Sequence, residues 1–154
     1  MKQLSERDEM TGLYNKNKYL EMMEKVYPKL DTVGVIFWDV NNLKRINDTM
    51  GHAQGDYIII SVSGIIKELI DNRKRAYRIG GDEFVMIIEN PGKGEIDEVL
   101  RGWKRYLEQR KKFSKIEISV SIGAAWGSGR DVVQVEKEAD EAMYQQKKRY
   151  HGRE

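Results

Sequence analysis

The chain has no cysteine, two histidines and two prolines, and it lacks a clear excess of either charge. The absence of cysteine excludes a disulfide framework and is compatible with a reducing cytosol. Lysine and arginine total 27 against 25 acidic residues, so bulk charge gives no case for binding nucleic acid. Long apolar runs are also missing, because residues 57–66 are far fewer than the roughly 20 that cross a bilayer. We therefore expect one ordinary domain of 154 residues, without nucleic-acid or membrane contact.

Residues 78–84, with the sequence Arg-Ile-Gly-Gly-Asp-Glu-Phe, are the stretch around which the rest of the chain is organised. Short segments rich in β-branched or aromatic residues, at 76–79 and 84–88, predict two strands. Gly80 and Gly81 predict a hairpin turn that tolerates positive φ and lets a ligand approach the backbone closely. Two adjacent carboxylates follow, so the turn is either a solvated one or a site for a positively charged ligand.

A second acidic position follows the apolar run at residues 33–38, which predicts a strand buried on both faces. Asp39 ends this run, and it converges with Asp82 if the two strands are neighbours. Two carboxylates at about 4 Å repel by roughly 4 kcal/mol, so either one is protonated or a cation lies between them. Oxygen ligands, no cysteine and little histidine favour magnesium or manganese over zinc. Two aspartates that hold such ions beside a glycine-lined turn are typical of enzymes that transfer phosphoryl groups.

The stretch Gly80-Gly81-Asp82-Glu83-Phe84 resembles the signature of the GGDEF family, the diguanylate cyclases. Further family motifs are matched, in order, by residues 8–15 (DEMTGLYN), 39–48 (DVNNLKRIND), 51–56 (GHAQGD), 121–125 (SIGAA) and 139–144 (ADEAMY). The resemblance covers nearly the whole chain. It implies a single catalytic domain over residues 1–154, expected to be the C-terminal part of a longer signalling protein.

The resemblance implies roles for the acidic residues. Asp39, Asp82 and the backbone carbonyl of Val40 match the family's metal ligands, for two Mg²⁺ or Mn²⁺ ions at each GTP site. Asp39 could alternatively be a strand-end cap. Glu83, which with Asp82 is expected to be catalytic, could ligate a second ion, accept the proton of the attacking hydroxyl, or pair with Arg78.

The expected substrate-binding residues, again by resemblance, are Lys44, Asn47, His52, Asp56, Gly80, Gly81 and Lys147. Asn47 and Asp56 match the guanine readers, since a carboxylate can accept from both N1–H and the exocyclic amine of guanine. Asp56 could also cap the helix it opens, Asn47 could be a turn residue and His52 could support the turn. Lys44 and Lys147 would supply point charge to the triphosphate, although a lone surface lysine usually serves solubility.

The activity implied is a diguanylate cyclase, a nucleotidyltransferase that condenses two GTP molecules into cyclic di-GMP and releases pyrophosphate. Each chain would hold one GTP, so a transient homodimer with two-fold symmetry is expected. The family also implies an upstream sensor and a cytoplasmic location, including the cytoplasmic part of a membrane-bound sensor. Two alternatives remain open: a silent GGDEF module that binds GTP or a dinucleotide as a signalling receiver, and an adenylyl cyclase or polymerase-like palm.

The periodicity of apolar residues predicts an α+β fold with a ferredoxin-like, split βαβ order and a mainly antiparallel sheet flanked by helices. The expected helices cover residues 16–30, 42–49, 56–70, 96–107 and 132–150, the strands 32–39, 76–79, 84–88 and 116–124, and a loop 51–55. We assign Trp38, Trp103, Tyr144 and the methionines to the core. The family's palm-like sheet is similar.

Some positions depart from the family pattern. Asn41 replaces an aspartate that is not a ligand in the family. The closing Gly-Arg comes two residues late, so either Arg149 or Arg153 could supply a second phosphate contact. Asp71 and Lys74 hold the positions where many relatives carry the Arg and Asp of an inhibitory R-x-x-D site. Because the charges are inverted, we expect no product inhibition through this site.

Overall fold

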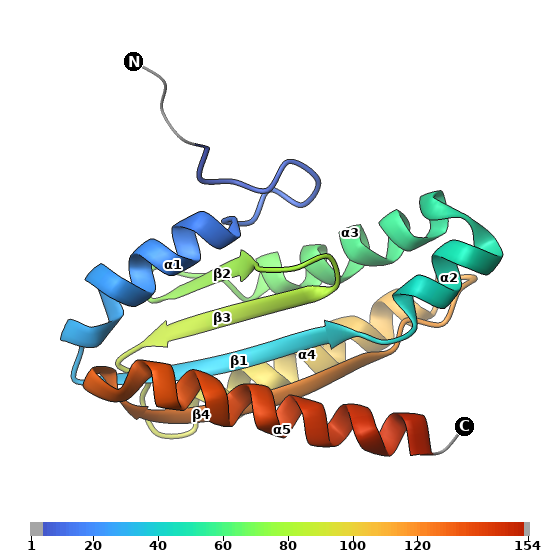
Figure 1. Ribbon diagram of the computed structural model, residues 1–154. Helices are drawn as coiled ribbons and strands as arrows, with labels where there is room; N and C mark the ends of the chain where they lie inside the picture. Colours follow the sequence, from blue (N-terminus) through green and yellow to red (C-terminus); the bar gives the residue numbers. More distant parts are fainter. Residues whose placement is uncertain (1–4, 153–154) are drawn as a thin grey trace.

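The computed structural model describes residues 5–152 and shows one four-stranded sheet between two layers of helices (Figure 1). The strands are β1 (Thr32–Val40), β2 (Lys74–Arg78), β3 (Glu83–Glu89) and β4 (Val120–Ser128), in the spatial order β2-β3-β1-β4. Every neighbouring pair is antiparallel. The predicted ferredoxin-like α+β fold is confirmed.

The helices form one layer on each face of the sheet. They are α1 (Lys16–Lys25), α2 (Leu43–Met50), α3 (His52–Glu68), α4 (Glu95–Lys111) and α5 (Val132–Gly152), with short 3₁₀ turns η1 (Tyr27–Lys29) and η2 (Gly129–Asp131). α3 and α4 pack on one face, and α1 and α5 on the other (Figure 1). Among residues 5–152 no helix is both long and apolar enough to cross a membrane.

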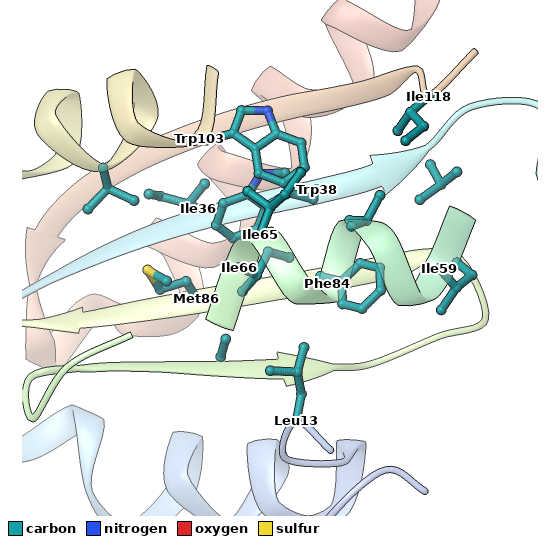
Figure 2. Packing of buried hydrophobic residues seen from close by; sticks show 14 of the residues in the cluster. Leu13, Ile36, Trp38, Ile59, Ile65, Ile66, Phe84, Met86, Trp103 and Ile118 are labelled. Carbon is teal, nitrogen blue, oxygen red and sulfur yellow. The ribbon is translucent and has the colours of Figure 1, made fainter. Parts of the chain in front are cut away.

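The central strand β1 is buried on both faces, as its uninterrupted apolar sequence predicts. Ile36 and Trp38 point toward α3 and α4, whereas Val35 and Phe37 point toward α1 and α5. Trp38 lies against Trp103 of α4, with ring centroids 5.6 Å apart, in the cluster of Figure 2. Because helices pack on both faces of β1, the position of Asp39 near the end of this strand is well defined.

Several predicted boundaries are wrong. The predicted first helix, over residues 16–30, ends at Lys25. Pro28, expected near the helix end, lies in the separate 3₁₀ turn η1. The predicted loop at 51–55 is helical beyond Gly51, whose φ of 94° ends α2 and lets α3 begin at the next residue. β4 begins at Val120 rather than 116; Ile118 is buried outside the ladder, since alternation reports burial and not strand pairing.

The assignment of aromatic and methionine residues to the core holds only in part. Trp38 and Trp103 are buried, but Tyr144 is 49% exposed and carries Lys148 over its ring. Its neighbour Met143 faces the core, and a step of one residue rotates a side chain by about 100° around a helix. Met10 and Met50 are also exposed.

Candidate active site

Three carboxylates meet at the end of the sheet where β1 leaves and β3 enters. The register pairs Asp39 with Glu83 directly, and Asp82 lies in the turn just before β3. One side-chain oxygen from each lies within 4.8 Å of those of the other two. The convergence of Asp39 with Asp82 is thus present, because antiparallel pairing brings the exit of one strand to the entrance of the next.

The electrostatics of this acidic cluster are unfavourable. Burial raises the pKa of Asp39, and the Asp82 carboxylate adds to the rise although Lys147 opposes it. Burial, followed by the charges of Asp39 and Asp82, raises the pKa of Glu83. Asp39 is only 5% exposed, and its Oδ1 is buried without a hydrogen-bond partner among the described residues. A hard divalent cation would relieve both the repulsion and the unpartnered oxygen, so these residues fit a metal site.

The signature turn is closed by main-chain bonds. The amide of Val40 donates to the carbonyl of Asp82 at 2.9 Å, and that of Ile79 to the carbonyl of Glu83 at 3.0 Å. Although glycine would permit a positive φ in this turn, neither Gly80 nor Gly81 adopts one.

Both signature glycines also have room for a side chain. A Cβ on Gly80 would meet only Glu83, at 3.6 Å or more, and a Cβ on Gly81 would meet nothing within 4 Å. Since neither packing nor backbone conformation within the described residues requires these glycines, close approach of a ligand is the remaining reason for them.

Arg78 holds the signature turn against the N-terminal motif. Its guanidinium donates to the carbonyl of Gly81 at 2.8 Å and pairs with Asp8 at 3.2 Å. The suggested pairing of Arg78 with Glu83 is wrong, and Glu83 faces the other two carboxylates instead. The motif at 8–15 is visible in the sequence, but the role of Asp8 is not, because Asp8 and Arg78 are 70 positions apart and meet only once the strands are placed.

A hollow of about 510 Å³ opens beside Asp82, between α2 and the end of α5. It is lined by Val40, Asn42, Leu43, Lys44, Arg45, Asp48, Thr49, Asp82, Lys147 and His151. Lys44 and Lys147 therefore border the same space as Asp82, as a triphosphate site requires. Lys147 now donates to Asp39 Oδ2 at 3.0 Å, so an anion in the hollow would compete for this ammonium group.

The predicted base-reading residues lie at the corner between α2 and α3, outside the lining of this hollow. His52 and Asp56 are exposed on the first turns of α3. Because α3 begins at His52, the suggestion that Asp56 caps the helix is wrong. Asn47 is half-buried on α2, with its Oδ1 unpartnered among the described residues.

The end of α5 is fastened over the site. Asn42 donates to the Tyr150 hydroxyl at 2.8 Å, next to the bond between Lys147 and Asp39. Arg149 is exposed, whereas Arg153, the alternative phosphate contact, lies outside the described residues. Asn41 is buried and bonds to two serines, one through each end of its amide, which is a structural role.

At the opposite end of the sheet, the positions of the inhibitory motif are occupied by an ion-pair cluster. Lys74 contacts Asp71 at 2.6 Å and Glu95 at 2.9 Å. Arg73 also contacts Glu95, at 2.5 Å, and Arg75 contacts Glu89. The basic side chains in this region are thus engaged within the chain.

The chain is similar to known proteins over nearly its whole length. The family model described as "Diguanylate cyclase, GGDEF domain" matches residues 5–153. Diguanylate cyclase DgcS of Shewanella oneidensis is 33% identical over 148 residues, covering 91% of this chain and 49% of that protein. Cyclic di-GMP phosphodiesterase PdeR of Escherichia coli is 30% identical over 155 residues, covering 97% and 23%. The chain spans about half, or less, of these curated relatives.

Among solved structures, the GGDEF domain of DgcB from Caulobacter crescentus, crystallised in complex with c-di-GMP, is similar to this chain. The TM-score is 0.81 at 25% identity, and the match covers 96% of this chain and 93% of that one. The similarity extends over the sheet and both helix layers rather than over the signature alone.

Proposed function

Because this chain belongs to the GGDEF family, we propose that it is a diguanylate cyclase that condenses two GTP molecules into cyclic di-GMP and two pyrophosphates. The observation that carries the proposal is the acidic cluster of Asp39, Asp82 and Glu83 at the rim of a hollow that contains two lysines. In each of two transfers, the 3′-oxygen of one nucleotide bonds to the α-phosphorus of the other. The bond from that phosphorus to the β-phosphate oxygen breaks, and pyrophosphate leaves with its electron pair.

Asp39, Asp82 and the carbonyl of Val40 would hold magnesium or manganese, two ions for each GTP. When bound, such ions lower the pKa of the attacking hydroxyl and neutralise charge on the phosphoryl oxygens. Glu83 has a raised pKa, so it is a better proton acceptor at neutral pH than an ordinary glutamate. We therefore favour Glu83 as the group that takes up the 3′-hydroxyl proton, a role it can share with ion binding.

The remaining residues bind and orient the nucleotide. Lys44 and Lys147 reach the hollow and would hold the triphosphate, with Lys147 exchanging Asp39 for phosphate. Gly80 and Gly81 would let a nucleotide lie directly on the backbone. Base recognition would fall to the corner between α2 and α3, where Asp56 offers an acceptor for guanine, with Asn47 and His52 beside it.

Each chain holds one half of the reaction. The two GTP molecules must face each other, so catalysis requires a transient homodimer, most simply with two-fold symmetry. Since the curated relatives are at least about twice as long, we propose that an upstream sensor domain controls this pairing. Membership of the GGDEF family is the ground on which we propose that the domain works in the cytoplasm.

The test is incubation of the purified chain with GTP and Mg²⁺, with the product identified by mass. Cyclic di-GMP is expected, and specific activity should rise with protein concentration because two chains meet. An equimolar mixture of GTP and ATP should still give mainly cyclic di-GMP. Binding of GTP without any product would instead support the silent receiver module, and activity independent of concentration would exclude the two-half-site mechanism.

A further inference from the structure

Two glycines lie at the corner between α2 and α3, and the fold requires them for different reasons. Gly51 has a φ of 94°, a conformation that other residues rarely adopt. Gly55 lies inside α3 without a positive φ, where glycine costs about 1 kcal/mol relative to alanine. Its reason is space, because a Cβ at Gly55 would lie 1.8 Å from Oδ1 of Asn47. No real contact is that short, so any side chain at 55 displaces the Asn47 amide.

The orientation of the Asn47 amide is defined by the same contact. Its oxygen points at Gly55, whereas its nitrogen is 3.4 Å from the same Cβ position. Within the part of the chain that the structure describes, this oxygen is buried without a hydrogen-bond partner, which costs about 1–3 kcal/mol. Main-chain bonds fix the corner, since the Gly51 amide donates to the Asn47 carbonyl and the Gly55 amide to the Gly51 carbonyl. An arrangement that costs folding energy and is held rigidly suits a recognition group rather than a packing one.

We propose that Gly55 is a positioning residue for nucleotide base recognition. By lacking a Cβ it lets the Asn47 amide lie against α3 with its nitrogen turned outward as a donor. The next residue, Asp56, is exposed and offers an acceptor. A donor and an acceptor side by side match the edge of guanine, which carries both kinds of group. This inference rests on the proposed function, because it assigns the base of the same GTP site.

The chain offers a matched control in Gly64, which also lies in α3 without a positive φ. A Cβ there would come 2.7 Å from a guanidinium nitrogen of Arg110, the flexible end of a long side chain that can move aside. Gly55→Ala and Gly64→Ala therefore make the same gain in helix propensity, but only the first is blocked by a side chain of the proposed site.

The experiment measures binding of 3′-deoxyGTP, which lacks the attacking hydroxyl, and of inorganic triphosphate, which lacks the base, both with Mg²⁺. For Gly55→Ala we expect the dissociation constant of 3′-deoxyGTP to rise about tenfold, the effect of one lost hydrogen bond, with triphosphate binding unchanged. Gly64→Ala should bind both ligands like the wild type. In an Asn47→Ala background, adding Gly55→Ala should change binding by less than about twofold, since its effect runs through Asn47.

Thermal unfolding followed by circular dichroism verifies that each variant is folded. A Gly55→Ala chain that binds 3′-deoxyGTP like the wild type overturns this inference and leaves the proposed function intact. Equal weakening in the wild-type and Asn47→Ala backgrounds also overturns it, because Gly55 would then act on the fold. A wild-type chain that binds inorganic triphosphate as tightly as 3′-deoxyGTP removes both the inference and the guanine substrate.

Discussion

The two ends of the sheet carry acidic clusters of the same size and opposite character. At the end where β3 begins, the three carboxylates of Asp39, Asp82 and Glu83 lie together, and among the ion pairs of the described residues only Asp39 has a cationic partner, Lys147. At the other end, the carboxylates of Asp71, Glu89 and Glu95 are matched by Arg73, Lys74 and Arg75. The pKa of Glu83 is raised by burial and by its acidic neighbours. The pKa of Glu95 is lowered to about 2, chiefly by its bond to Arg73.

This difference between the two clusters distinguishes residues that serve binding from residues that serve folding. A carboxylate with a lowered pKa is stabilised by the fold around it, whereas carboxylates with raised pKa values are held together against their own repulsion. The unbalanced cluster therefore needs a partner that residues 5–152 do not supply, and the balanced one needs none. Perturbed carboxylates mark a functional site only when their neighbours fail to neutralise them.

The largest expected effect is on the turnover of GTP, which should depend on the cluster of Asp82 and not on the cluster of Glu95. Asp82→Asn keeps the shape of the side chain but removes a metal-binding charge, so turnover of GTP should fall by about three orders of magnitude or more. Glu95→Gln, at the other cluster, should turn over GTP like the wild type. Initial rates of pyrophosphate release at saturating GTP measure both. An Asp82→Asn rate within tenfold of the wild type would mean that the unbalanced cluster is not the reaction centre.

The second prediction concerns stability, where we expect the cluster around Glu95 to matter more than the cluster around Asp39. Glu95→Gln leaves Arg73 and Lys74 without their shared partner and should lower the free energy of unfolding by about 1–3 kcal/mol. Asp39→Asn removes repulsion and should leave the metal-free stability unchanged or raise it, although Lys147 loses its partner. Urea unfolding in a chelating buffer measures both. Loss of stability in Asp39→Asn larger than in Glu95→Gln would show that the first cluster is structural.

The same contrast explains what the sequence predicts well. Each strand is visible as a short apolar run with a polar residue at its end, so the convergence of Asp39 with Asp82 could be predicted on the condition that the two strands are neighbours. The structure meets this condition by pairing β1 with β3. The partners of those residues could not be predicted. Lys147 and Tyr150 of α5 reach the site from more than a hundred positions away, and Arg78 meets Asp8 across 70. Such contacts depend on how whole helices pack, which periodicity does not encode.

The predicted loop at 51–55 failed for a related reason. Glycines at 51 and 55 suggest a break, but only Gly51 has a positive φ. Gly55 is helical, and its lack of a side chain serves Asn47, a contact between two helices. The ion-pair cluster around Glu95 could not be predicted either, because Arg73 and Arg75 taken alone have the pattern of a solvated basic turn. A charge run does not reveal which acidic residues will be folded onto it.

The third prediction concerns pH. The lowered pKa of Glu95 means that its pairing stabilises the fold above pH 4.5 and that this stability is lost as pH falls from 4.5 through about 2. The raised pKa of Glu83 has the opposite sign, since its ionised form costs stability near neutral pH and acidification relieves that cost. The free-energy difference between the wild type and Glu95→Gln should therefore stay constant from pH 8 to pH 5.

For Glu83→Gln in metal-free buffer, we expect an advantage in stability over the wild type at pH 8 that shrinks continuously as the pH falls toward 4.5. Urea titrations across this range measure both variants. If the stability of Glu83→Gln relative to the wild type instead increases as the pH falls, then a partner neutralises the Glu83 carboxylate in the wild type and the two clusters do not differ.

The smallest expected effect tests whether the balanced cluster can bind the product. The family resemblance implies an Arg and an Asp of an inhibitory site at positions 71 and 74; here Asp71 and Lys74 hold these positions and bond to each other. Arg73 is engaged by Glu95 and by the carbonyl of Glu89, so a phosphate would have to displace existing partners. Adding cyclic di-GMP should change the initial rate at saturating GTP by less than about twofold, because free cations are needed for tight phosphate binding. Progress curves should then stay linear until GTP is depleted or the half-site itself retains product.

Arg73→Ala/Arg75→Ala is the control, since it removes both arginines and should leave the rate and its response to cyclic di-GMP unchanged. Strong inhibition that is non-competitive with GTP and is abolished in this double variant would show that the cluster opens to bind product, and the contrast between the two ends of the sheet would fail.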